Sequence, residues 1–252
     1  MVSSFDSIPH DRLMAEVEKE VADGRVIELL RAYLKAGIFD GLEEWTPDEG
    51  TPQGAVISPL LANIYLHPVD IAMAAAGCEM VRYADDFVVM CRNQTEAEDA
   101  LHMVRELIEE RGLTLHPEKT RIVDATQRGG FDFLGYHFER GYRWPRKKSM
   151  KKLRDALRAK TKRNNGNSLT TIIESINPTL KGWFGYFKHS HRNVFTDVDG
   201  WVRMRLRSIL RRRHHGRGRG RGNDHLRWPN SFFREAGLFS MQEARTLLCR
   251  SR

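Results

Sequence analysis

The sequence predicts an α+β domain, in which helices back an antiparallel sheet, followed by an all-helical domain. Strand and helix patterns are mixed up to about residue 145, and only helical patterns follow. Residues 1–130 hold 12 Lys and Arg against 24 Asp and Glu, a net charge of −12, whereas residues 131–252 hold 29 against 9, a net charge of +20. This split indicates metal chemistry followed by polyanion binding, and two domains that differ only in surface charge are the alternative.

Composition argues against several protein classes. The three cysteines, Cys78, Cys91 and Cys249, form no CxxC pair, which argues against a disulfide framework or a cysteine-rich zinc site. No apolar stretch reaches the roughly 18 residues of a membrane span. The chain does not open with a basic and then apolar signal pattern, so we expect a cytoplasmic, nucleic-acid-associated protein.

The first elements are helical. Residues 9–37 have apolar side chains three or four positions apart, and Asp23-Gly24 divides them into two predicted helices. Residues 38–56 are rich in Pro and Gly, which predicts turns. Residues 57–75 return to a helical pattern, with Ser58 as the predicted N-cap and Pro59 at the first helical position.

A hairpin and a long helix are predicted next. Residues 79–92 place the polar sequence Ala-Asp-Asp between two apolar runs, as in a β-hairpin. Residues 95–112 form a predicted helix in which Thr95 is the N-cap and Glu98 completes a capping box. Residues 113–125 and 131–140 are predicted to be strands or a second hairpin.

The remaining chain is predicted to be mostly helical. Helices are expected over 149–163, 168–189 and 195–215. Pro178 is a candidate break in the second of these helices. The repeat GRGRGRG at 216–222 predicts a flexible linker before a short tail. The predicted domains are therefore residues 1–145, residues 146–215, the linker 216–222 and the tail 223–252.

Adjacent carboxylates carry the clearest chemical signal. Asp85 and Asp86 lie at the predicted hairpin tip, where like charges repel each other. A divalent cation relieves that repulsion, and Mg²⁺ prefers one or two carboxylates together with phosphate oxygens. Two such ions can stabilise both the attacking and the leaving oxygen of a phosphoryl transfer. A solvated Asp-Asp turn is the alternative.

The order of several motifs resembles one family. YADD follows TPQGAVISPLLANIYL and precedes GLTLHPEKT, FDFLGYHF and INPTLKGWFGYF. In this order the motifs resemble the reverse transcriptase–maturase proteins of group II introns, of the bacterial kind, over essentially the whole chain. The resemblance implies a polymerase palm over 1–145 and a helical thumb, or maturase domain, over 146–215. It implies an RNA-directed DNA polymerase that uses two Mg²⁺ ions and also acts as a splicing maturase.

The resemblance also assigns roles to residues. Asp85 and Asp86 match the paired metal-binding acids, and Lys119 matches a lysine that protonates the leaving pyrophosphate. The positions that match nucleotide, template or primer contacts are Phe5, Pro52, Gln53, Gly54, Tyr83, Leu134 and Gly135. Structural alternatives stay open: a sheet aromatic at Tyr83, a plain turn at 52–54, a surface lysine at 119 and a core hairpin at 134–135.

The basic half is predicted to bind RNA. Its expected phosphate contacts are Lys181, Lys188, Arg203, Arg205, Arg207, Arg211, Arg212 and Arg213. The alternative for the arginine series is a solvated helix. The aromatics at 183–187 are expected to pack in the helical core, and a platform on which RNA bases stack is the alternative. The Arg-Gly repeat resembles segments that bind RNA loosely, and an uninvolved linker is the alternative.

The resemblance leaves one catalytic acid unmatched. Relatives carry a third catalytic Asp five residues before the aromatic that Phe5 matches. In this sequence, that position falls just before Met1. Asp6 instead matches the acid next to the aromatic, which is not catalytic. We therefore expect an N-terminally truncated protein without fingers and without this Asp, unless a shifted register lets Asp6 substitute. The expected partners of the intact enzyme are intron RNA, an RNA template with a DNA primer, and deoxynucleoside triphosphates. A polymerase-inactive RNA-binding maturase fragment, or a degenerate remnant, is the alternative.

Overall fold

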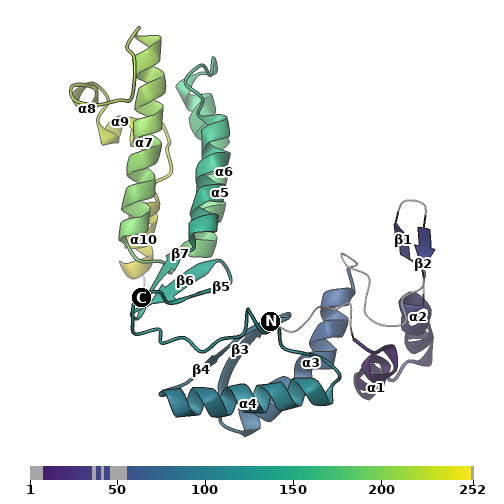
Figure 1. The fold of residues 1–252 in the computed structure, drawn as a ribbon. Helices are drawn as coiled ribbons and strands as arrows, with labels where there is room; N and C mark the ends of the chain where they lie inside the picture. Colours follow the sequence, from purple (N-terminus) through teal and green to yellow (C-terminus); the bar gives the residue numbers. More distant parts are fainter. Residues whose placement is uncertain (1–7, 36–37, 41–42, 46–55, 251–252) are drawn as a thin grey trace. The chain divides into compact units, whose positions relative to one another are not determined.

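The computed structural model describes residues 8–35, 38–40, 43–45 and 56–250 (Figure 1). The chain divides into two compact units, of which the first is Met1–Ile122 and the second Val123–Arg252. No helix in the described part of the chain is both long and apolar enough to cross a membrane.

The first unit combines helices with short antiparallel sheets. Its described helices are α1 (His10–Glu20), α2 (Gly24–Leu34), α3 (Ser58–Ala75) and α4 (Gln94–Glu110). Its strands form two antiparallel pairs, β1 (Ile38–Asp40) with β2 (Glu43–Trp45), and β3 (Glu79–Tyr83) with β4 (Asp86–Met90). The predicted division of the first helix is confirmed, because the Asp23 carboxylate accepts hydrogen bonds from the backbone N–H groups of Arg25 and Val26 and so caps α2.

The core of this unit lies between α1, α3, α4 and one face of the β3–β4 hairpin. Its side chains with at most 2% exposure include Leu13, Val17, Leu61, Tyr65, Met73, Val104 and Ile108. Alternation along the strands turns Met80, Phe87 and Val89 toward this core. The hairpin is thereby held on a helical base.

Two local predictions in this unit are corrected. The N-cap of α4 is Asn93 rather than Thr95: its side chain accepts from the Glu96 backbone N–H at 2.8 Å, and the Glu96 carboxylate accepts from the Arg92 N–H at 2.9 Å. Asn is a stronger N-cap than Thr, and the acid three residues on is Glu96. The strand predicted over 113–125 is wrong, since these residues form turns and one isolated bridge; Pro117 there lacks the N–H that a ladder requires.

The second unit begins with a three-stranded antiparallel sheet. Its strands are β5 (Phe131–Phe133), β6 (Tyr136–Glu139) and β7 (Tyr142–Pro145), in the order β5-β6-β7. This sheet precedes the predicted domain boundary at residue 145, yet it belongs to the second unit. The Ser149 hydroxyl of α5 (Lys147–Lys160) donates to the Gly135 carbonyl at 3.1 Å, and the Tyr136 hydroxyl donates to the Tyr186 carbonyl at 2.6 Å.

Helices build the rest of the second unit. They are α5, α6 (Leu169–Phe187), α7 (Asn193–Arg213), α8 (Asp224–Arg227), α9 (Asn230–Glu235) and α10 (Met241–Arg250). The break predicted at Pro178 is absent, and α6 runs through it. On either side of the proline, Ile176 and Leu180 are buried, and Lys160 donates to the Ser175 carbonyl at 2.8 Å. Tertiary packing therefore outweighs the hydrogen bond that proline removes.

The tail folds back onto α7 (Figure 1). The buried carboxylate of Asp199 accepts from the backbone N–H groups of Met241 and Gln242, each at 3.1 Å, and from the Ser240 hydroxyl at 2.7 Å, so it caps α10. The Arg-Gly segment 216–222, predicted to be a flexible linker, is also hydrogen-bonded to α7. Gly220 is buried, and its N–H donates to the Ser208 hydroxyl at 3.2 Å.

Candidate functional site

The two adjacent acids lie at the tip of the β3–β4 hairpin, which confirms the predicted hairpin. Tyr83 pairs with Asp86, so Ala84 and Asp85 form a two-residue turn. Ala84 has a φ of 55°, in the left-handed region, as tight hairpin turns require. Asp85 therefore belongs to the turn and Asp86 to the first position of β4, and both side chains are half-buried.

The outer face of the hairpin carries the predicted aromatic. Tyr83 is 67% exposed and Val81 is 45% exposed. Residues directly opposite each other share a face, so Asp86 lies on the same face as Tyr83. An exposed aromatic beside a carboxylate is available to a ligand, whereas a core aromatic would be covered.

Two carboxylates at one tip offer the hard oxygen ligands that Mg²⁺ prefers, with water and phosphate completing its shell. In the described part of the chain, no group of three or more His, Cys, Asp or Glu side chains is arranged to hold a metal. Asp85 and Asp86 therefore form no closed site with other described residues, and their role as a metal-binding pair stays a prediction. A pair fits an ion that is shared with a phosphate-bearing substrate.

An arginine that sequence reasoning missed holds this tip in place. Arg82 of β3 is 11% exposed and donates from Nε and Nη2 to the two carboxylate oxygens of Asp70, at 2.7 and 2.5 Å. Its Nη1 donates to the Asn63 side-chain oxygen and to the Ala84 carbonyl, each at 2.9 Å. Arg82 thus ties the turn that contains Asp85 to α3.

A sequence signal for this network exists. Alternation along β3 places Arg82 on the inner face of the strand, among apolar residues. An arginine in that position needs a hydrogen-bonding partner. Asn63 and Asp70 are seven residues apart on α3, which places them two turns apart on one helix face. The pairing itself depends on how α3 and the hairpin pack.

Five of the predicted site residues gain no structural support. Lys119 is exposed in the turn after α4, and its role remains a prediction. Phe5, Pro52, Gln53 and Gly54 lie outside the described residues. Their roles also remain predictions.

The predicted primer-contacting residues form the β5–β6 turn. Leu134 and Gly135 have φ values of 47° and 80°, so both adopt left-handed conformations. The Tyr186 hydroxyl donates to the Leu134 carbonyl at 2.7 Å, and a Cβ at Gly135 would lie 3.6 Å from the Phe187 ring. The turn is therefore anchored on α6, as in the structural alternative of a core hairpin, and Leu134 remains 36% exposed.

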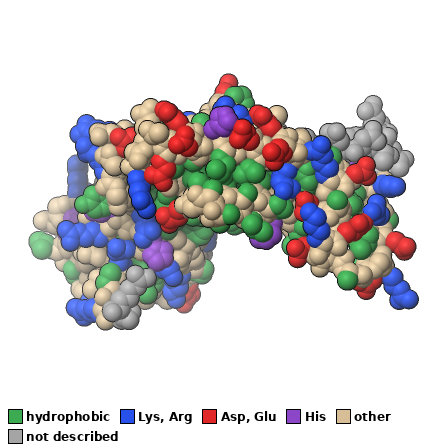
Figure 2. Space-filling model, turned by 90° about the horizontal axis from the view of Figure 1, so that it is seen from below, with side chains coloured by type: hydrophobic (Ala, Val, Ile, Leu, Met, Phe, Trp, Pro, Cys, Tyr) green, Lys and Arg blue, Asp and Glu red, His purple; other side chains and the backbone are tan. Residues whose placement is uncertain are grey.

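The structure divides the predicted RNA-binding residues into two groups. In the first group Lys181, Lys188, Arg212 and Arg213 are exposed, and Arg203 is half-buried. Figure 2 shows blue Lys and Arg side chains gathered over the second unit, at the left. These side chains are available to a polyanion, although the Arg213 guanidinium also donates to the Asn167 carbonyl.

The second group consists of arginines with protein partners. Arg207 is 3% exposed and donates to the Trp228 carbonyl at 2.9 Å. Arg205 donates to the Thr161 hydroxyl at 2.6 Å, and Arg211 pairs with Asp224 at 2.6 Å. Burial lowers the pKa of Arg205 and of Arg207, and neighbouring arginines lower each further. These three arginines, expected to face RNA, instead join α7 to its neighbours.

The aromatics of α6 follow the expected core packing in part. Phe184 and Phe187 are buried, and the rings of Trp183 and Phe187 lie 4.7 Å apart. Tyr186 is 55% exposed. The helix therefore uses its aromatics mainly to fill the core.

Comparisons with known proteins agree with this arrangement. The family model described as reverse transcriptase (RNA-dependent DNA polymerase) matches residues 1–138, and that of the group II intron maturase-specific domain matches residues 150–228. The chain is 41% identical over 66 residues to the group II intron-encoded protein LtrA of Lactococcus lactis subsp. cremoris, which covers 26% of this chain and 11% of LtrA.

Two longer matches extend the likeness. Protein YkfC of Escherichia coli (strain K12) is 31% identical over 176 residues, 55% of this chain and 45% of YkfC. The putative COX1/OXI3 intron 1 protein of Saccharomyces cerevisiae is 26% identical over 268 residues, 82% of this chain and 31% of that protein. The chain thus spans less than half the length of these relatives. It belongs to the reverse transcriptase family and carries the maturase-specific domain of group II intron proteins.

Proposed function

We propose that this chain is part of an RNA-directed DNA polymerase and splicing maturase encoded by a group II intron. The observation that carries the proposal is the acidic hairpin tip, tied to α3 by Arg82, within the region that matches reverse transcriptases. A maturase-specific domain on the same chain supports the splicing role.

In this proposal Asp85 and Asp86 hold divalent cations, with Mg²⁺ as the expected metal. Such ions, when bound, would stabilise the attacking and leaving oxygens of nucleotidyl transfer. Arg82 holds the Ala84 carbonyl and thereby restricts the backbone of the turn that carries Asp85. Tyr83, exposed on the same face as Asp86, is available to contact the primer or the nucleotide. Lys119 is the proposed proton donor to pyrophosphate.

The second unit is proposed to bind intron RNA. Residues 131–252, which make up most of this unit, hold 29 Lys and Arg against 9 Asp and Glu, and binding to phosphates would relieve their self-repulsion. The alternative function is RNA binding without polymerisation, and the charge favours it independently of the hairpin. Both functions require the exposed cations, whereas only the polymerase requires Asp85 and Asp86.

One experiment separates the two functions. The purified chain is assayed for primer extension on an RNA template with Mg²⁺ and deoxynucleotides, and for binding of a group II intron RNA across a salt series. Extension that Asp85→Ala abolishes supports the polymerase. Tight, steeply salt-dependent RNA binding without extension supports the RNA-binding alternative. Weak binding that is insensitive to salt would contradict both.

A further inference from the structure

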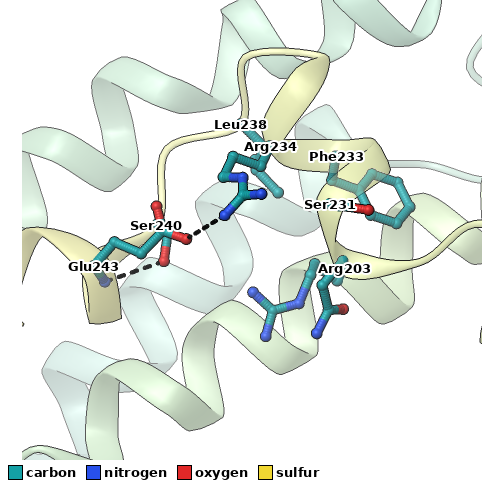
Figure 3. A pocket seen from close by; sticks show the side chains of 8 residues that line it. Arg203, Ser231, Phe233, Arg234, Leu238, Ser240 and Glu243 are labelled. Carbon is teal, nitrogen blue, oxygen red and sulfur yellow. Dashed lines mark hydrogen bonds and ion pairs between the residues drawn. The ribbon is translucent and has the colours of Figure 1, made fainter.

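A small cavity opens in the second unit where α7, α9 and the start of α10 meet (Figure 3). Its volume is about 140 Å³. Its polar lining consists of Arg203, Asn230, Ser231, Arg234, Ser240 and Glu243. We call this cavity the Arg203 pocket.

The Arg203 pocket has more positive than negative charge. Arg203 and Arg234 enter it from α7 and α9 (Figure 3), and Glu243 is its acidic member. The ion pair between Arg234 and Glu243 is long, at 3.8 Å, and its side chains are 64% and 58% exposed, so it neutralises little of the charge. Within the described part of the chain, the side chain of Arg203 makes no hydrogen bond or ion pair.

A third guanidinium lies behind the lining. Arg207 donates to the side-chain oxygen of Asn230 at 2.8 Å and to the Trp228 carbonyl at 2.9 Å, so neutral acceptors hold its charge. Because the oxygen of Asn230 is already occupied, its NH₂ group remains as a donor for the cavity. The charge of Arg203 adds to burial in lowering the pKa of Arg207, which is the effect of crowded like charges.

These features describe an anion site. Two guanidiniums, an amide NH₂ and the Ser231 hydroxyl can all donate hydrogen bonds into one space. Planar guanidinium groups match the oxygens of phosphate, and a partly enclosed site strengthens each charge-assisted bond. An entering anion would also relieve the repulsion between Arg203 and Arg207.

We propose that the Arg203 pocket binds one phosphodiester group of RNA. The RNA assignment rests on the proposed function, since the pocket belongs to a strongly basic unit that would concentrate a polyanion at its mouth. Free inorganic phosphate offers the same chemistry from another source.

The test uses the full chain and nuclear magnetic resonance titration with inorganic phosphate. Phosphate should shift the backbone amide signals of Ser231, Arg234 and Ser240. Arg203→Gln should weaken this binding about tenfold, the effect of losing a charge-assisted contact. Lys152→Gln removes an exposed cation of α5 that does not line the pocket and should leave these shifts unchanged. Glu243→Gln should tighten binding a few-fold, a gain that misfolding could not produce.

RNA binding is then measured on the same variants. Arg203→Gln should lower RNA affinity and reduce the slope of log K against log salt by about one. If the phosphate-induced shifts are the same in Arg203→Gln as in the unmodified chain, the anion site is wrong. If the RNA affinity of that variant is unchanged, the RNA assignment is wrong. If the unmodified chain binds no RNA, the proposed function fails together with the RNA assignment, and the phosphate titration still decides whether the pocket is an anion site.

Discussion

Replacing Arg82 with alanine should destabilise the hairpin tip more than the same replacement at any neighbouring arginine. Arg82→Ala removes four hydrogen bonds, two of them to the Asp70 carboxylate. Breaking a buried ion pair costs about 3–5 kcal/mol, and a single hydrogen bond to a charged group contributes about 1.5–3 kcal/mol. Asp70 is 32% exposed, so water partly compensates the carboxylate that is left behind. We therefore expect a loss of about 3 kcal/mol.

Hydrogen exchange measures this loss where it occurs. Protection of the amides in β3 and β4 should fall on the order of 100-fold, the equivalent of about 3 kcal/mol, while α6 and α7 should keep theirs. The proposed function further predicts weaker binding of Mg²⁺ in this variant, because the turn that contains Asp85 is no longer fixed to α3. Both effects follow from the same contacts, so they should appear together.

The matched control for this prediction is Arg105→Ala. Arg105 lies on α4 and is exposed, and its side chain makes no hydrogen bond or ion pair within the described residues. A double-mutant cycle between Arg82→Ala and Asp70→Ala should give a coupling of about 1–3 kcal/mol. Strictly additive effects, or equal losses in Arg82→Ala and Arg105→Ala, would refute the reasoning.

Three further predictions concern the second unit. Asp199→Ala should destabilise it by about 2–3 kcal/mol, because α10 loses its cap; calorimetry and loss of amide protection in α10 report this, and an unchanged melting temperature would contradict it. Gly182→Ala should stabilise α6 by about 0.5–1 kcal/mol, measured by denaturant unfolding, because a Cβ there meets nothing within 4 Å; a loss of stability would show that the position is covered. The backbone N–H of Arg221, followed by the Arg211 guanidinium, lowers the pKa of Asp224 below its usual 3.8. Its stabilising contribution is therefore present above about pH 4 and is lost as pH falls through the lowered value. Protection of the Gly220 amide should follow that pH dependence, and Asp224→Asn should remove the dependence.

Local elements were predicted well where the chemistry is local. The β3–β4 hairpin and the break at Asp23 depend on residues a few positions apart, and both are confirmed. The N-cap of α4 was misplaced by two residues, because Asn93 and Thr95 offer similar signals; the bond from the Glu96 N–H to the Asn93 side chain decides between them. The strand predicted over 113–125 failed because apolar character alone does not supply a pairing partner.

Only the local part of the candidate site could be predicted from the sequence. Asp85 and Asp86 could be identified because their adjacency and the surrounding motifs are visible in the sequence. Arg82 could not be assigned a role, since its partners Asp70 and Asn63 lie 12 and 19 residues away on a helix. Arg203 was expected to bind RNA from its place in the arginine series, but the cavity around it depends on a tail more than 25 residues later in the chain.

The sequence by itself determined the family, most of the longer helices and the acidic hairpin, because periodicity, turn residues and motif order are properties of short stretches of chain. Only the tertiary structure decided what each arginine does. Arg205, Arg207 and Arg211 have partners in other helices or in segments that fold back onto α7, whereas Arg212 remains exposed. A guanidinium costs free energy to bury unless it is paired, so packing alone determines which arginines serve the fold and which remain available for RNA.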